Sequence, residues 1–483
     1  MHGADLGAPS ARVAWKVVLA SIIALATAGA VFLMRGTPLS GDEPLYGLRS
    51  RSFRWGETPW FEWPSYRAPG LPLLAAPLVG LPEPILRAVI VCFAAASVVL
   101  VYTLARTFVG QSSAMWAAVV FAATPGLLAS SVYFFPDVPG MFLVLVTVVS
   151  MVRYLLGKGS HWWLLLMCAS LAVAGVVRFS VGMVALSAFV ALLVAAPSAL
   201  SACRGRSAVT GGLLVAITAA GNFLPAIGSQ DGLSPWAANR ELATQNAEPL
   251  SRRLVTLADT SSWAFGLSRQ LSVGAIAGTG FLMVCGTGLL VGLRSAWRSR
   301  DRLVLFPITW FFFTLGFYLV VLGHFEIRYL VPLFAPLAMV AGRGLSLVAR
   351  RMAPTWTTVL VAVTLAAGLL FGSYVITVQL RADDAEDLAV RSVGNFVAAT
   401  DRDCVMTFGS DGGKVWLLPW YSGCHASSGA GAQVYVAVWR DASVPASPPR
   451  ANAELVHSEA FTLTKQGDTD RRVIDLYRLA DAS

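Results

Sequence analysis

The sequence predicts a polytopic α-helical membrane protein that ends in a small soluble domain. Its mean hydropathy is +0.65, and 56% of its residues are hydrophobic whereas only 13% are charged. Apolar runs recur from residue 13 to residue 377, and the composition turns polar after residue 380. A water-soluble fold needs polar faces to cover its core, so these runs exclude a soluble globular protein.

The apolar runs have the length of membrane-spanning helices, roughly 17 to 25 residues each. We expect about eleven spans, near residues 13–34, 84–107, 112–130, 138–156, 161–177, 180–200, 207–227, 270–293, 303–322, 329–348 and 355–377. The first run contains an Ala26-Thr27-Ala28 triplet that resembles a signal-peptidase site. Because many spans follow it, we expect this run to be retained as the first span.

Basic residues predict the orientation of these spans. With a cytoplasmic N-terminus, the basic turns fall on the cytoplasmic side, at Arg106, at Arg153 with Lys158, at Arg204 with Arg206, from Arg294 to Arg302, and at Arg350 with Arg351. An odd number of spans then places the C-terminal region outside the cell. The net charge of +9 fits orientation across anionic lipid, and no face combines basic and aromatic residues for nucleic acid.

The C-terminal region, residues 381–483, predicts a small extracytoplasmic α/β or α+β domain. An amphipathic stretch, Asp384–Ala399, precedes strand-like segments at Cys404–Phe408, Val434–Trp439, Ala460–Thr464 and Arg472–Leu479. Cys404 and Cys424 lie in this polar region, where a disulfide is plausible if the domain is outside the cell. The sequence leaves their pairing open.

The loop between the first two spans, residues 35–83, carries the first candidate site. It begins with Asp42 and Glu43, and a loop of this length is usually functional. We interpret Asp42 as part of a catalytic site at the outer face of the membrane, against the alternative of a solvated carboxylate. Arg67 precedes a Pro/Leu-rich segment that fits an interfacial helix, where a guanidinium is suited to gripping a lipid phosphate.

Three further polar positions adjoin spans at the same predicted face. Asp137 opens the fourth span, as a helix cap or as a second site carboxylate. Arg178 lies between two apolar runs, solvated in a tight turn or paired. Four polar side chains then cluster ahead of the proline-rich tenth span: His324, Glu326, Arg328 and Tyr329.

Taken in order, these motifs resemble the GT-C glycosyltransferases, over roughly residues 10 to 350. The nearest branch is the protein O-mannosyltransferase and aminoarabinose-transferase type, family 39 and related bacterial members. The resemblance rests on Asp-Glu after the first span, a basic residue before a Pro/Leu helix, an aspartate opening the fourth span, and a late Glu-x-Arg-Tyr-x-x-Pro motif. It implies a GT-C transmembrane catalytic domain over residues 1–380.

The family transfers a sugar from a polyprenyl-phosphate carrier to an outer-face acceptor with inversion. By resemblance, Asp42 is the catalytic base, Glu43 supports it, and Asp137 is the second acid. The residues expected to bind the donor phosphate or sugar are Arg67, Arg178, His324, Glu326, Arg328 and Tyr329. Where relatives have Lys-Pro-Pro-Leu, this chain has Arg67-Ala68-Pro69-Gly70, which keeps the charge but leaves the phosphate contact open.

The expected partners are a polyprenyl-phosphate-linked sugar, membrane lipids, and a glycan, lipid or protein acceptor of the cell envelope. A divalent metal at Asp42 and Asp137 is compatible with two carboxylates, although the motifs require none. One alternative is a transporter or flippase of a lipid-linked sugar, which predicts charges at the bilayer midplane and repeated halves. Another is a membrane scaffold, which would not need Asp42, Asp137 or Arg328.

Overall fold

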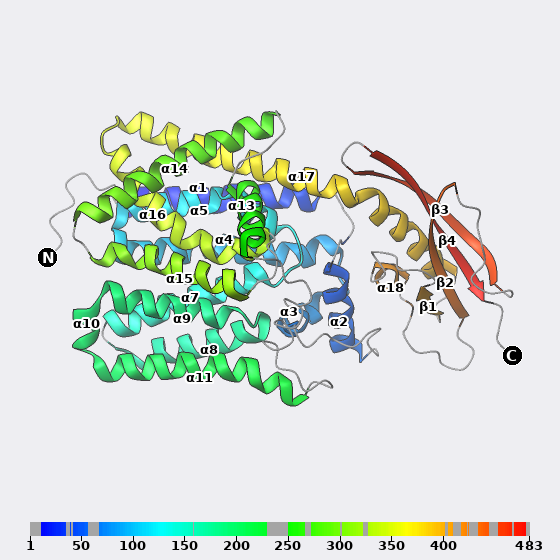
Figure 1. The fold of residues 1–483 in the computed structure, drawn as a ribbon, viewed down its shortest axis with the longest axis horizontal. Coiled ribbons are helices and arrows are strands. Elements are labelled where there is room, and N and C mark those ends of the chain that lie inside the picture. The colour runs from blue at the N-terminus through cyan, green and yellow to red at the C-terminus, as the bar shows by residue number, and fades with distance from the viewer. Residues whose placement is uncertain are drawn as a thin grey trace.

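The protein consists of a helical bundle and a four-stranded sheet, joined by one long helix (Figure 1). This architecture comes from a computed structural model. It describes residues 11–34, 39, 42–56, 67–157, 159–228, 250–265, 272–299, 302–321, 327–400, 404–408, 417–422, 424, 433–443, 453–465 and 468–479. We call the end of the bundle nearer the sheet the sheet end.

Eleven predicted spans correspond in position to helices of the bundle. These are α1 (Ala11–Leu33), α4 (Glu83–Val109), α5 (Gln111–Ala123) with α6 (Pro125–Ser131), α7 (Asp137–Leu156), α8 (His161–Val177), α9 (Val181–Ala195) with α10 (Pro197–Ser201), α11 (Arg204–Gly228), α14 (Val273–Ser299), α15 (Leu305–Val321), α16 (Val331–Ala349) and the first half of α17 (Pro354–Thr400). The sequence did not predict α13 (Leu250–Phe265).

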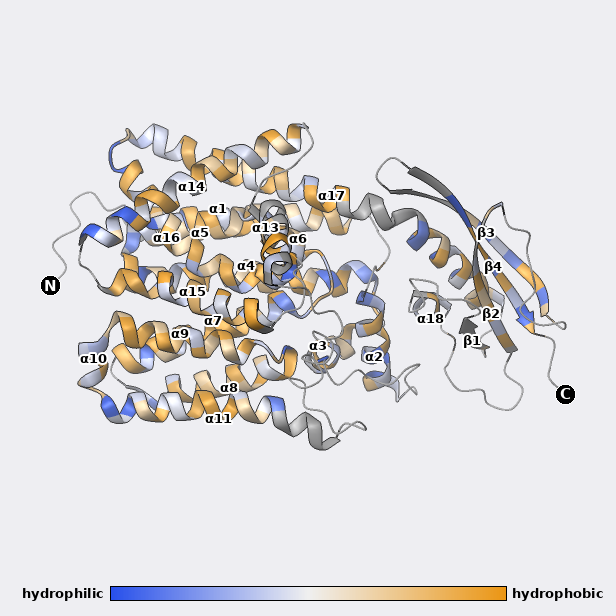
Figure 2. Ribbon diagram, viewed as in Figure 1, coloured by the Kyte–Doolittle hydropathy of each residue, from blue (hydrophilic) through white to orange (hydrophobic). Residues whose placement is uncertain are grey.

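The number of membrane crossings is smaller by a test of length and composition. Among the described residues, six helices are long and apolar enough to cross a bilayer, or seven if the α5–α6 pair, bent by 54°, forms one span. Helices α8, α9 and α15 are apolar but shorter. The protein is therefore a multi-pass membrane protein, while the predicted count of eleven spans is not confirmed. Figure 2 shows hydrophobic residues along most of the bundle.

Glycines allow the closest helix contact in the bundle. Helices α14 and α16 approach so closely that a Cβ added at Gly344 would overlap the backbone oxygen of Gly288. A Cβ added at Gly342 would likewise overlap the backbone nitrogen of Ala117 in α5. Small residues at such crossings let backbones pack together where lipid supplies no hydrophobic driving force. This packing fixes α16, whose first turn follows Arg328 and Tyr329.

The sheet has the order β1-β2-β4-β3, with β1 parallel to β2 and the other pairs antiparallel. Its strands are β1 (Cys404–Phe408), β2 (Gln433–Asp441), β3 (Ala453–Lys465) and β4 (Asp468–Leu479). All four strand-like segments of the sequence are thereby confirmed. The short helix α18 (Leu417–Ser422) lies beside α17, and a disulfide joins Cys404 to Cys424.

Helix α17 connects the bundle to the sheet without a break. The stretch Asp384–Ala399, expected as a separate amphipathic helix, is the second half of this 47-residue helix. At 1.5 Å per residue the helix is about 70 Å long. The expected domain boundary at residues 380 and 381 falls inside it.

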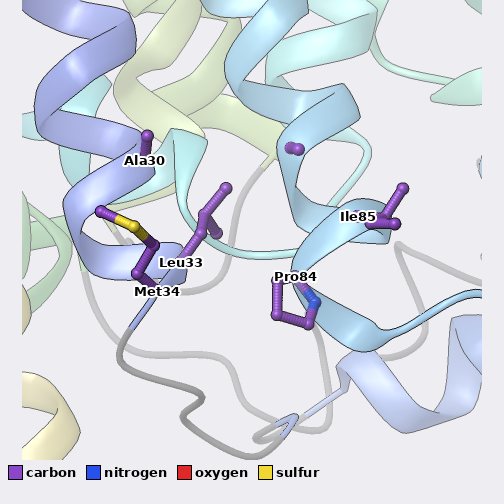
Figure 3. Close-up of a pocket in the computed structure, with 6 residues that line it drawn as sticks. Ala30, Leu33, Met34, Pro84 and Ile85 are labelled. Atoms are coloured by element: carbon purple, nitrogen blue, oxygen red, sulfur yellow. The ribbon is translucent and has the colours of Figure 1, made fainter.

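An apolar groove opens at the sheet end between the end of α1 and the start of α4 (Figure 3). Its lining consists of Ala30, Leu33 and Met34 from the α1 side and Pro84, Ile85 and Ala88 from α4. Helices α2 (Glu43–Trp55) and α3 (Gly70–Ala75) lie at this same end (Figure 1).

Candidate active site

Helix α2 (Glu43–Trp55) places the acidic pair at the sheet end. Asp42 occupies its N-cap position, and Pro44 stands in the first turn, where proline is tolerated because its missing N–H has no helical partner. Glu43 in the first turn and Arg54 in the last complement the helix dipole. Gly56 ends the helix with φ of 68°, a left-handed conformation that favours glycine.

Asp42 lies between two arginines from distant parts of the chain. Its Oδ1 is 3.0 Å from Nη2 of Arg67, and its Oδ2 is 3.6 Å from Nη2 of Arg328. The Asp42 side chain is 33% exposed, whereas each arginine is 15% exposed. The carboxylate is thus paired yet still accessible. The structure brings together three of the residues that the sequence singled out.

Asp137 forms a second ion pair close by. At the start of α7 it is buried and pairs with Nη1 of Arg178, which follows α8. The Nε of Arg178 also donates a hydrogen bond to Oγ of Ser180 at 3.0 Å. Pro136 occupies the N-cap position of α7 and Asp137 lies in the first turn, so Asp137 is not the N-cap residue, and its carboxylate is paired with Arg178.

Aromatic rings connect the two ion pairs. The guanidinium of Arg178 lies 5.1 Å from the ring centroid of Tyr329, and that of Arg328 lies 5.3 Å from the same ring. Arg328 also lies 4.1 Å above the ring of Phe135, two residues before Asp137. Cation–π contacts orient the guanidinium groups without consuming their hydrogen-bond donors. The two carboxylates and three arginines therefore form one cluster.

Tyr46 lies beneath this cluster on α2. Its ring is 5.7 Å from the guanidinium of Arg67, and its electrostatic neighbours include Asp42, Arg178 and Arg328. Burial raises the pKa of Tyr46, and the nearby arginines offset only part of that rise. The phenol consequently stays neutral at physiological pH.

Glu43 differs from its neighbour Asp42 because it is completely buried. Its Oε1 accepts a hydrogen bond from Nε of Arg87 at 2.9 Å, and its Oε2 accepts one from Nη2 of Arg87 at 2.5 Å. Oε1 also accepts the backbone N–H of Phe134 at 2.5 Å. Glu43 thereby joins α2 to α4 and to the loop that leads into Asp137.

Arg87 was not singled out from the sequence. The signal available was its position, an arginine in the first turns of an apolar span, where an unpaired charge is costly. Arginines near the ends of spans are common, so the position of Arg87 did not by itself indicate a buried ion pair. Its partner became evident only from the fold.

The segment around Arg67 folds much as expected. The predicted interfacial helix is present as α3 (Gly70–Ala75), followed by a 3-10 turn, Ala76–Leu78. A Cβ added at Gly70 would lie 2.6 Å from the carbonyl oxygen of Val176 at the end of α8. Glycine at this position, a departure from the family pattern, therefore lets the Arg67 loop pack against the helix that precedes Arg178.

Comparison with known proteins connects this geometry to a fold. A family model described as dolichyl-phosphate-mannose-protein mannosyltransferase matches residues 73–224. ArnT from Cupriavidus metallidurans bound to undecaprenyl phosphate matches with a TM-score of 0.65 and 12% identity, over 95% of this chain and 97% of that chain. This chain has the GT-C fold. No curated protein sequence matches it significantly.

Archaeal oligosaccharyltransferases share the GT-C fold over most of this chain. The apo form from Archaeoglobus fulgidus matches with a TM-score of 0.54 and 11% identity, over 86% of this chain and 65% of that chain. AglB from the same organism, in complex with an inhibitory peptide and a dolichol-phosphate, matches with a TM-score of 0.52 and 10% identity, over 86% and 69% of the two chains. The fold expected from the sequence is confirmed.

Within this GT-C fold, the described site comprises Asp42, Glu43, Arg67, Asp137, Arg178, Arg328 and Tyr329. Two other residues named from the sequence, His324 and Glu326, lie outside the described residues. The late motif is thus described from Ile327 onward, where a 3-10 turn, Ile327–Leu330, leads into α16.

The described residues of this cluster are poorly suited to binding a divalent metal. Asp42 already engages Arg67 and Arg328, and Asp137 engages Arg178. No group of three or more His, Cys, Asp or Glu side chains suited to a metal occurs among the described residues. A cation that bound both Asp42 and Asp137 would have to displace their arginine partners.

Proposed function

We propose that the protein is an inverting glycosyltransferase that moves a sugar from a polyprenyl-phosphate carrier to an acceptor at the outer face of the membrane. The observation that carries this proposal is Asp42, an accessible carboxylate between Arg67 and Arg328 at one end of a GT-C helical bundle. The solved structures of ArnT and AglB, which share the fold, hold undecaprenyl phosphate and a dolichol-phosphate respectively, which supports a lipid-phosphate donor.

The arginines are the groups that bind the donor phosphate. Arg67, Arg178 and Arg328 converge from three different segments, and each is largely shielded from water. Preorganised cations of this kind stabilise the negative charge that develops on a leaving phosphate. When the phosphate pairs with Arg67 and Arg328, Asp42 loses its own partners and becomes a free carboxylate.

Asp42 then acts as the general base. An acceptor hydroxyl or amine gives its proton to the Asp42 carboxylate while its oxygen or nitrogen attacks the anomeric carbon. The bond from that carbon to the phosphate oxygen breaks, and its electron pair leaves with the polyprenyl phosphate. A single displacement from the opposite face inverts the anomeric carbon. Tyr46 is no competing base, because burial raises its pKa and keeps it protonated.

The isoprenoid chain of the donor requires an apolar path beside this site. The groove between α1 and α4 opens at the same end of the bundle, and its lining side chains are all apolar (Figure 3). Three of its lining residues, Pro84, Ile85 and Ala88, belong to the first turns of α4, the helix that also carries Arg87, the partner of Glu43. We expect the chain to run along this groove and remain in contact with lipid.

The orientation follows from the two ends of the bundle. The basic turns that contain Arg106, Arg153, Arg204 and Arg350 lie at the end opposite the sheet (Figure 1). By the positive-inside rule we expect that end to be cytoplasmic, with the site and the sheet outside the cell. A disulfide between Cys404 and Cys424 agrees with an oxidising compartment.

The test is transfer from polyprenyl-phosphate-linked hexose and pentose donors to a panel of lipid, glycan and peptide acceptors, in membranes carrying wild type or Asp42→Asn. We expect the substitution to lower kcat by about 10²–10⁴-fold, since it removes a general base but keeps the shape of the side chain. The matched control is Glu454→Gln, an exposed carboxylate of the sheet. Equal transfer by wild type and Asp42→Asn would refute the assignment of Asp42.

A further inference from the structure

The short helix α18, between the sheet and the bundle, packs directly on the helix that carries the acidic pair. The Trp420 side chain is 5% exposed, and its six-membered ring rests on Gly47 of α2. A Cβ added at Gly47 would lie 2.5 Å from this ring. Any side chain at residue 47 would therefore push the two helices apart.

Two polar contacts fix the position of the same tryptophan. Its Nε1 donates a hydrogen bond of 2.8 Å to Oε1 of Glu83, the first residue of α4. The guanidinium of Arg51, one turn beyond Gly47, lies 4.2 Å from the ring centroid. Trp420 thus contacts both α2 and α4, the two helices that the buried Glu43–Arg87 pair also joins.

Tyr421 holds the chain on the other side of Asp42. Its hydroxyl accepts a hydrogen bond of 3.0 Å from the backbone N–H of Leu39, three residues before Asp42. Burial raises the pKa of Tyr421, so the phenol is neutral and this contact persists at physiological pH. Helix α18 accordingly contacts the chain before Asp42, at Leu39, and after it, at Gly47.

Helix α18 is also anchored to the C-terminal region. Cys424, two residues after α18, forms the disulfide with Cys404 of β1. A Cβ added at Gly394 of α17 would lie 2.6 Å from Cβ of Tyr421, so α18 also packs tightly on the long helix. The segment is therefore held between α17 and β1 on one side and the chain around Asp42 on the other.

We propose that α18 sets the position of Asp42 in the active site and that Trp420 is a positioning residue for the transfer reaction. The inference rests on the proposed function and gives the C-terminal region a role within it. The contacts described above for Trp420 and Tyr421 are with Gly47, Arg51, Glu83, Leu39 and Gly394. They act by fixing α2 and the segment before it, so that the Asp42 carboxylate lies at a constant distance from Arg328 and from the Asp137–Arg178 pair.

The test combines transfer kinetics with hydrogen exchange of the full-length protein in detergent micelles. The donor is a polyprenyl-phosphate sugar that wild type uses. The variants are Trp420→Ala, Gly47→Ala, Trp420→Phe and the double variant Gly47→Ala/Trp420→Phe, with Glu454→Gln as the control on the sheet. Exchange is measured at the amides of α2, and kcat and KM for the donor are measured separately.

We expect Trp420→Ala to speed exchange in α2 and to lower kcat by up to about 100-fold, because a displacement near 1 Å is enough to misplace a catalytic group. The KM for the donor should stay near that of wild type. Gly47→Ala should lower kcat by about tenfold in the wild-type background. In the Trp420→Phe background the same substitution should lower kcat by less than about twofold, because the smaller phenylalanine ring leaves room for the methyl group. The control should match wild type.

Equal effects of Gly47→Ala in the two backgrounds would overturn the inference, since they would show that residue 47 and the ring do not interact. Faster exchange in α2 with unchanged kcat would also overturn it, because Asp42 would then need no support from α18. If wild type transfers sugar from no donor while Trp420→Ala still speeds exchange in α2, the proposed function fails and the docking of α18 on α2 is retained.

Discussion

Asp42 and Glu43 are adjacent acids at the start of one helix, both paired with arginine, yet their surroundings differ in kind. Asp42 is 33% exposed and has one oxygen near Arg67 and the other near Arg328. Glu43 is 0% exposed and receives two hydrogen bonds from Arg87 and one from the N–H of Phe134. Two adjacent residues of the chain therefore carry one carboxylate that solvent reaches and one that it does not.

The difference indicates a division of labour between the two carboxylates. An ion pair in contact with water is easily exchanged for another partner, because solvent offsets the loss of either charge. A buried pair has no such substitute, and separating it leaves an uncompensated charge in a medium of low dielectric. Asp42 is therefore suited to changing partners during a reaction, whereas Glu43 is suited to holding α2, α4 and the Asp137 loop in one arrangement.

The largest expected effect comes from breaking the buried pair on one side. Arg87→Met leaves Glu43 without its cation, and we expect the free energy of unfolding to fall by about 3–5 kcal/mol. The measurement is thermal unfolding of the purified protein in detergent, followed by tryptophan fluorescence. Arg106→Met, an exposed arginine in the last turn of the same helix, is the matched control.

Removing the second charge tests whether the loss is electrostatic. In Glu43→Gln/Arg87→Met the amide oxygen still accepts the N–H of Phe134, and no unpaired charge is buried. We expect the double variant to be more stable than Arg87→Met alone, because the cost of a broken buried pair lies mainly in the remaining charge. A double variant that is less stable than Arg87→Met would mean that packing, and not charge, dominates at this position.

Breaking the accessible Asp42–Arg328 pair should lower the transfer activity and leave the free energy of unfolding unchanged. Arg328→Met removes a cation from Asp42 and from the proposed phosphate site, and we expect kcat to fall by about 10²–10³-fold, as for loss of one preorganised charge-stabilising donor. The unfolding transition should stay close to that of wild type. Arg54→Met is the control, since Arg54 is exposed and donates only to the backbone oxygen of Pro77 among the described contacts.

A large loss of stability in Arg328→Met, comparable to that of Arg87→Met, would contradict the division of labour. It would place the Asp42 pair among the structural supports of the fold. Transfer rates equal to wild type would instead remove Arg328 from the phosphate site and leave Arg67 and Arg178 to bind the donor.

Much of this arrangement could be predicted from the sequence. Hydrophobic run length located the bundle helices except α13, which is less apolar and lies between the predicted spans 207–227 and 270–293. Period-two patterning located all four strands. Asp42, Asp137, Arg178 and Arg328 each stood out because a charge beside an apolar run is costly without a partner.

Contacts between distant segments could not be predicted in the same way. Glu43 and Arg87 are 44 positions apart, and nothing in the local pattern of either residue names the other. The same holds for Gly47 and Trp420, which meet because α17 carries the C-terminal region to the end of the bundle where α2 lies (Figure 1). The local sequence shows that a charge beside an apolar run needs a partner, whereas only the fold shows which residue pairs with it.

A smaller effect separates charge from geometry at Arg67. Arg67→Lys keeps the positive charge but loses the planar guanidinium, which contacts Asp42 and lies over the ring of Tyr46. We expect the Kd for undecaprenyl phosphate to rise by about threefold to tenfold, because lysine binds phosphate as a point charge. Arg54→Lys, tested in the same binding assay, should leave the Kd unchanged. An unchanged Kd for Arg67→Lys as well would show that charge alone suffices there.

The smallest expected effect is that of metal removal, and it tests whether Asp42 works as a base or as a ligand. Chelation with EDTA should change kcat by less than about twofold, whereas a metal-dependent enzyme would lose most of its activity. The reason is that Asp42 and Asp137 have arginine partners and that the described residues supply no third ligand for a cation. Transfer is measured after dialysis against the chelator, with Mg²⁺ or Mn²⁺ restored in a parallel sample. Loss of transfer that either ion reverses would show that a cation displaces these arginines during the reaction, and Asp42 would then be a metal ligand in place of the free carboxylate proposed here.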